Sequence, residues 1–181
     1  MRSSTYEGLF YNLACSHQLI QHHDDSPRFA RLVVSVDPMQ RVMDLEELQT
    51  VLLGRYLKPG AGEQVLVLES LQTSYRDNKG DNYQRQRRGA FFLLEQVTDS
   101  AKAWEALDRT EQTGEQLLGA ILHKFSTDPK VRWEVGSIQA DAVGPLGSDL
   151  NWYGTRFDFE FFTSATAALR FDPTVFTLPI Q

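Results

Sequence analysis

Histidines next to carboxylates are the residues in this sequence that could bind a metal or transfer a proton. His22 and His23 directly precede Asp24 and Asp25. Adjacent side chains on an extended segment point apart, and no second cluster supplies the spaced ligands that a zinc site uses. We therefore interpret this segment as a solvated turn and predict no metal site. The fourth histidine along the chain, His123, falls near the end of a predicted helix, where the helix dipole favours a cation.

Pairs of carboxylates are a second candidate for chemistry. Glu46 and Glu47 are adjacent, and Asp158 and Glu160 are two residues apart, which places them on one face of a strand. General acid–base catalysis also needs a cleft that perturbs one of the two pKa values. The sequence shows no sign of such a cleft, and it contains no HExxH, GxSxG, GxxxxGK[ST] or GxGxxG motif. It therefore predicts no catalytic residue, no cofactor and no enzyme.

A basic stretch over residues 76–88 offers binding chemistry instead. Its cations outnumber the two acids Asp77 and Asp81, and they are Arg76, Lys79, Arg85, Arg87 and Arg88. The stretch joins two apparent strands, so we expect a long projecting hairpin loop. Two interpretations stay open. The charges can prevent aggregation of the apolar strand that follows, or the loop can contact an acidic partner or the phosphates of DNA.

The C-terminal tail, residues 169–181, is apolar and irregular. Pro173 and Pro179 exclude a helix or a central strand. So apolar a segment must pack on its own domain or on a neighbouring subunit. Own-domain packing is slightly favoured for Phe171 and Phe176, whereas residues 177–181 equally suit another subunit. The candidate inter-subunit contacts are Phe171, Val175, Phe176, Leu178 and Ile180.

The strongest pattern is the alternation over residues 155–162. Phe157, Phe159 and Phe161 occupy every second position, with charged residues between them. This pattern predicts a strand with an aromatic face in the core and a charged face in water. The run of apolar residues at 91–94 predicts another strand, which is buried on both faces.

The remaining patterns complete an α+β fold in a single domain, residues 1–181. We expect helices over 5–21, over 43–57 with Asp44 as N-cap, and from Asp99 or Ser100 to Phe125. The last helix places Trp104, Leu118 and Ile121 on one stripe. Strands are expected over 30–37, 63–75, 87–97, 130–143 and the aromatic segment. The order predicts a mixed, mostly antiparallel sheet with helices packed on one face.

Composition restricts the class of protein. Of the 181 residues, 41% are hydrophobic and 23% are charged, which is typical of a globular protein. The net charge of −6 argues against a general nucleic-acid binder. The N-terminal segment is a poor signal peptide and no run of about 20 apolar residues occurs, so we expect a soluble protein made in a cytoplasm, with no membrane partner.

The element order, together with the ending GSDLNWYGTRFDFEFFTSATAALRFDPTVF, resembles small tail-terminator and tail-completion proteins from the neck of tailed bacteriophages. The resemblance rests mainly on Asn151-Trp152-Tyr153-Gly154 before the aromatic strand and on Phe171-Asp172-Pro173 after it. It implies a non-enzymatic virion protein without catalytic residues, which forms a ring, typically hexameric. The ring would cap the tail tube and join it to the head.

The implied partners are copies of the chain itself, the tail tube protein and the head–tail connector proteins, with passive contact to DNA in the lumen. Assembly would take place in the cytoplasm of the bacterial host. Two alternatives stay open. The first is a head-side neck adaptor or another tail component, and the second is a small-ligand-binding protein or enzyme whose site no motif reveals.

Overall fold

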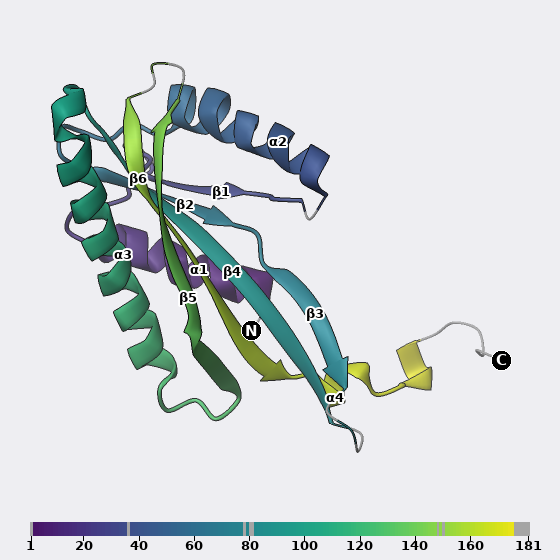
Figure 1. Cartoon of the computed structure of the whole chain (residues 1–181). Helices are drawn as coiled ribbons and strands as arrows, with labels where there is room; N and C mark the ends of the chain where they lie inside the picture. Colours follow the sequence, from purple (N-terminus) through teal and green to yellow (C-terminus); the bar gives the residue numbers. More distant parts are fainter. Residues whose placement is uncertain are drawn as a thin grey trace.

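The computed structural model describes residues 2–35, 37–77, 79, 82–147, 149 and 151–175 (Figure 1). The described residues form a six-stranded sheet in the order β1-β2-β4-β6-β5, and β3 pairs with the first half of β4. Its strands are β1 (Phe29–Leu32), β2 (Gln64–Glu69), β3 (Gln72–Asp77), β4 (Tyr83–Gln96), β5 (Val131–Leu146) and β6 (Trp152–Ser164). Only the β1–β2 pair is parallel. The predicted α+β class with a mostly antiparallel sheet in one domain is confirmed.

Helices cover parts of both faces of this sheet. They are α1 (Ser3–Ser16), α2 (Pro38–Glu47), the π-helical η1 (Leu48–Tyr56), the short 3-10 turn η2 (Ser100–Lys102), α3 (Ala103–Phe125), α4 (Thr166–Leu169) and the 3-10 turn η3 (Pro173–Val175). Among these described elements, every helix is too short or too polar to span a bilayer.

The larger core lies between the sheet and helices α1 and α3. Phe157, Phe159 and Phe161 are all buried in it, which confirms the aromatic face of β6. Phe91 of β4 stacks on Phe157 with ring centroids 5.2 Å apart. At Gly114, α3 packs so closely on the sheet that a β-carbon there would overlap the Phe157 ring.

The second core lies on the opposite face, under η1. Alternate residues of β2 and β4 point into it, including Val65, Val67, Phe92 and Leu94. The predicted burial of residues 91–94 on both faces is thus confirmed. The prediction that the helices pack on one face of the sheet holds only for α1 and α3, because η1 packs its buried leucines against the other face.

The charged face of β6 is not open to water as predicted. Asp158 is only 4% exposed. Arg156 binds Glu69 of β2 at 2.7 Å and Asp158 at 3.0 Å, and Arg88 of β4 binds Asp158 at 2.8 Å. The alternation therefore encodes an ion-pair network across three strands. β6 supplies Arg156 and Asp158, whereas Glu69 and Arg88 come from β2 and β4, which the sequence of β6 alone does not reveal.

The predicted start of the second helix, and its predicted cap, are wrong. The second helix begins at Pro38, with the Asp37 carboxylate accepting a hydrogen bond from the Gln40 N–H at 3.1 Å. The predicted cap Asp44 lies inside α2, where its side chain accepts from the Ser35 N–H at 2.7 Å. In contrast, Asp99 caps the next helical segment as expected, accepting from the Ala101 N–H.

The predicted loop over 76–88 is too long. β3 extends to Asp77 and β4 begins at Tyr83, so most of the basic stretch lies in strands, and residues 84–88 of β4 pair with β3 on one side and with β6 on the other. Cross-strand pairs such as Tyr75 with Arg85 continue the ladder. The polar arginines and glutamines of this stretch predict a loop, but β-propensity depends on context, and a strand paired on both sides accommodates them.

Candidate functional site

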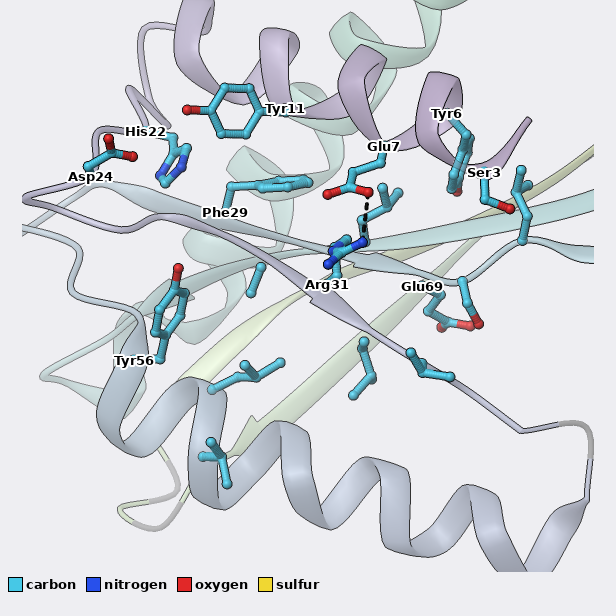
Figure 2. A pocket seen from close by; sticks show the side chains of 18 residues that line it. Ser3, Tyr6, Glu7, Tyr11, His22, Asp24, Phe29, Arg31, Tyr56 and Glu69 are labelled. Atoms are coloured by element: carbon cyan, nitrogen blue, oxygen red, sulfur yellow. Dashed lines mark hydrogen bonds and ion pairs between the residues drawn. The ribbon is translucent and has the colours of Figure 1, made fainter. Parts of the chain in front are cut away.

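A groove of about 690 Å³ runs along the outer edge of β1. Figure 2 shows α1 on one side of it and η1 on the other, with β1 as the floor. The groove exists because the chain crosses from α1 to β1 on one face of the sheet, then continues into α2 and η1 on the other. β1 is left uncovered between the two helical walls.

The floor of the groove is an open strand edge. Toward β2, the Arg28 and Leu32 carbonyls accept hydrogen bonds at 2.8 and 2.9 Å from Leu66 and Ser70. In a parallel ladder, successive residues direct their main-chain N–H and C=O groups alternately toward and away from the neighbouring strand. The main-chain groups of residues 29, 31 and 33 therefore face outward. In the described part of the chain, no strand pairs with this side of β1.

The walls of the groove are apolar and exposed. Tyr11 of α1 and Tyr56 of η1 face the groove from opposite sides (Figure 2). Val33 extends the floor and is 76% exposed, and Val51 adds a further exposed apolar side chain. Exposed apolar surface beside an open edge is typical of a site that another chain covers.

The polar groups of the groove have structural roles. Arg31 binds Glu7 at 2.7 Å in an exposed pair (Figure 2), which contributes little to stability. The buried Tyr6 hydroxyl donates to the Ala90 carbonyl at 3.4 Å. Burial, and then the charge of Glu69, raise the pKa of Tyr6 well above its ordinary value. The Tyr6 hydroxyl therefore stays protonated at neutral pH.

His22 is also structural, and it is buried rather than solvated as predicted. Its Nδ1 accepts a hydrogen bond from the Arg28 N–H at 3.1 Å, so the ring proton sits on Nε2. The ring meets Tyr11 edge-on at 5.1 Å between centroids. Burial is the main cause that lowers the pKa of His22, which keeps the imidazole neutral. His123, in contrast, lies exposed in the last turn of α3 as predicted.

Within the described residues, no three His, Cys, Asp or Glu side chains are placed to hold a metal ion. The groove therefore offers apolar walls and unpaired main-chain groups. This combination suits an extended peptide segment, whose own main chain can pair with the edge.

A second exposed apolar region borders the opposite edge of the sheet. β5 pairs only with β6 in the described part of the chain. Beside it, Trp104 is 76% exposed, although the sequence predicted this residue on the buried stripe of α3. Trp104 lines a second cavity of about 320 Å³ with Leu107, Val143 and Tyr153. In the described part of the chain, the edges at β1 and β5 are thus open and bordered by apolar side chains.

The predicted basic residues are distributed over β3, β4 and the segment between them. Arg76 lies in β3 and Lys79 in the turn, while Arg85, Arg87 and Arg88 lie in β4. Because side chains alternate, Arg85 and Arg87 share one face and Arg88 points to the other. The structure therefore separates Arg88, which binds Asp158, from the other two.

The predicted tail contacts fall partly within the described residues. Phe171 is 62% exposed and Val175 is 70% exposed, so their own domain covers only a minor part of each. This differs from the expectation that Phe171 packs on its own domain. Phe176, Leu178 and Ile180 lie outside the described residues.

The sequence missed the groove and the Glu69–Arg156–Asp158 network. The same-face spacing of Asp158 and Glu160 was visible, but the cations that neutralise Asp158 come from β6 itself and from β4. Comparison with known proteins adds no assignment: no protein-family model matches the chain, and no curated protein matches it.

Proposed function

We propose that the chain is a non-enzymatic structural subunit that assembles with copies of itself into a ring. The observation that carries this proposal is the pair of open sheet edges, β1 and β5, each bordered by exposed apolar side chains. Open edges of this kind are normally paired or covered in native proteins. The two edges differ, so a contact between them is head-to-tail, and repetition of a head-to-tail contact closes into a ring when the rotation permits.

The resemblance to tail-terminator and tail-completion proteins supplies the biological setting of this proposal. The ring, hexameric in that family, would cap the tail tube of a bacteriophage at the neck and join it to the head. One side would meet the tail tube protein and the other the head–tail connector. The ring would assemble in the host cytoplasm and become part of the virion, with DNA passing through its lumen.

A head-side neck adaptor is the alternative within the same class. It would use the same assembly chemistry but a different partner. Pull-down of the purified chain with tail tube protein and, separately, with connector protein distinguishes the two positions.

The groove beside β1 favours one further candidate, a small-ligand-binding protein. Its volume of about 690 Å³ falls in the range of about 300–1,000 Å³ that is usual for ligand sites. Such a protein would be a stable monomer whose melting temperature rises when a ligand occupies the groove. A thermal-shift screen with small aromatic compounds, using Tyr56→Ala as the control that removes one wall, tests this candidate.

Electron microscopy of the purified full chain tests the ring. The proposal predicts closed particles with rotational symmetry in negative stain. Uniform single-copy particles at high protein concentration would contradict it.

A further inference from the structure

Two arginines in the first half of β4 lack a counter-ion. Arg85 and Arg87 lie on the same face as Phe91, the face that α1 and α3 cover further along the strand. Arg87 is only 7% exposed. Neither arginine forms an ion pair within the described part of the chain, whereas Arg88, the next residue along β4, binds Asp158.

Hydrogen-bond acceptors are missing at the same place. The Nε atoms of Arg85 and Arg87 and the Oγ1 atom of Thr163 are buried without a partner in the described structure. Thr163 lies directly opposite Arg85 in the β4–β6 ladder. One strand further on, the buried indole N–H of Trp133 is also unpaired. Buried donors without acceptors are rare in native proteins, so this cluster lacks a group that completes it.

The free donors at this place suit an oxyanion. We call Arg85, Arg87 and Thr163 the arginine recess, and its free groups are N–H and O–H donors, two of them on cations. The Arg85 guanidinium lies over the Tyr75 ring, 5.4 Å from its centroid. The ring covers one flat face and leaves the N–H edge, which is the edge that binds a carboxylate in bidentate fashion. Burial, followed by the charge of Arg85, lowers the pKa of Arg87, in agreement with a cation that lacks its anion.

A protein carboxylate fits the recess better than the phosphates of a nucleic acid. The chain carries a net charge of −6, which repels a polyanion at long range. Arg87 is recessed, whereas nucleic-acid binding relies on cations that reach the phosphate backbone at the surface. A single acidic side chain can enter a recess of this kind.

The chain itself presents suitable carboxylates on α3. Asp108, Glu111 and Glu115 are exposed and follow one another at spacings of three and four residues, so they form an acidic ridge on one side of the helix. In the described structure, none of the three forms an ion pair. Like charges at this spacing destabilise a helix, and a cation from outside would relieve that repulsion.

The acidic ridge lies on α3, whereas the recess lies on β4 and β6. Figure 1 shows α3 along the side of the sheet where β5 lies, and β3 along the other side of β4. We propose that the arginine recess of one copy binds a carboxylate of the acidic ridge on a second copy. This inference rests on the proposed ring and specifies its contact: each subunit gives one ridge and receives another, as head-to-tail closure requires.

Charge reversal in the full chain tests the contact. The ridge variant carries Glu111→Lys and Glu115→Lys, and the recess variant carries Arg85→Glu and Arg87→Glu. Each change should raise the concentration at which half of the chains assemble by about 30-fold or more, the usual loss for a desolvated charge pair. An equimolar mixture of the two variants should assemble again, because every ridge then faces a recess of opposite charge.

Two controls separate this contact from other effects. Glu46→Lys with Glu47→Lys makes the same charge change on α2 and should leave assembly unchanged. Circular dichroism shows whether charge reversal at the buried Arg87 unfolds the chain. If it does, Arg85→Gln replaces the recess variant, and this variant and the ridge variant then decide the test. Titration with labelled double-stranded DNA measures binding to the alternative partner.

The outcomes are distinct. If the unaltered chain assembles but the ridge variant assembles equally well, the contact is wrong and the proposed ring stands. If the unaltered chain is a monomer, the ring and the contact both fail. DNA binding that the recess variant abolishes, with unchanged assembly, would assign the recess to nucleic acid and overturn the inference.

Discussion

Gly114 shows how a single residue sets the distance between α3 and the sheet. A glycine inside a helix ordinarily weakens it, and replacement by alanine stabilises an exposed helix position by about 0.5–1 kcal/mol. At Gly114 the added methyl group would overlap the buried Phe157 ring. We predict that Gly114→Ala lowers the free energy of unfolding by about 1–3 kcal/mol, the usual cost of overpacking.

Gly119 is the matched control for this prediction. It lies in the same helix, and a β-carbon there has no atom within 4 Å. Gly119→Ala should therefore raise the free energy of unfolding by about 0.5–1 kcal/mol. Urea denaturation measures both variants, and equal effects at the two positions would show that Phe157 does not limit the approach of α3.

His22 makes stability depend on pH. Its pKa in the folded state is lowered from the ordinary 6.5, mainly by burial. The unfolded chain therefore takes up this proton at a higher pH than the folded chain. The contribution of His22 is fully present above the unfolded pKa of about 6.5 and is lost as the pH falls below it.

We predict that the free energy of unfolding decreases from about pH 7.5 to about pH 5.5, and that His22→Asn makes the decrease smaller. Asparagine can keep an acceptor for the Arg28 N–H but does not titrate. Urea denaturation of both proteins at the two pH values measures the difference. An identical decrease in the variant would exclude His22 as the cause.

At the scale of the elements, the Arg156 network joins the outward charges of three strands. Burial acts to lower the pKa of Arg156, but the hydrogen bond and charge of Glu69, together with Asp158, outweigh it and raise the pKa. Arg156→Met would leave the buried Glu69 and Asp158 without their shared cation. We predict a loss of about 3–5 kcal/mol in the free energy of unfolding.

Arg31→Met is the control at this scale. Arg31 also binds a carboxylate at 2.7 Å, but its side chain is 63% exposed and that of Glu7 is 36% exposed. Its replacement should cost less than about 1 kcal/mol. A similar cost for both variants in chemical denaturation would mean that the network contributes no more than a surface pair.

The elements also show how far the sequence alone leads. The alternation in 155–162 and the apolar run at 91–94 correctly predicted two central strands, because burial fixes which faces are apolar. The strand ends within 76–88, residues 76–77 of β3 and 83–88 of β4, have a polar sequence that predicts a loop, since their ladders are formed by main-chain groups and leave no apolar pattern. The groove, the recess and the network depend on which strands become neighbours, and residues far apart in sequence create them.

At the scale of the whole molecule, the C-terminal segment bears on assembly. Val175 is 70% exposed in the single chain, and residues 172–181 are mostly apolar. We predict that deletion of residues 172–181 weakens self-association while the circular dichroism spectrum and the urea midpoint remain those of the full chain. An unchanged assembly mass after the deletion would show that the tail does not brace a neighbour.

We propose that open strand edges and complementary charges make this chain assemble head-to-tail. Native mass spectrometry of the purified full chain at micromolar concentration tests that claim most directly. We predict one dominant species whose mass is a fixed multiple of the chain mass, with no series of larger open multimers. A spectrum containing only the single chain at every concentration would contradict the account.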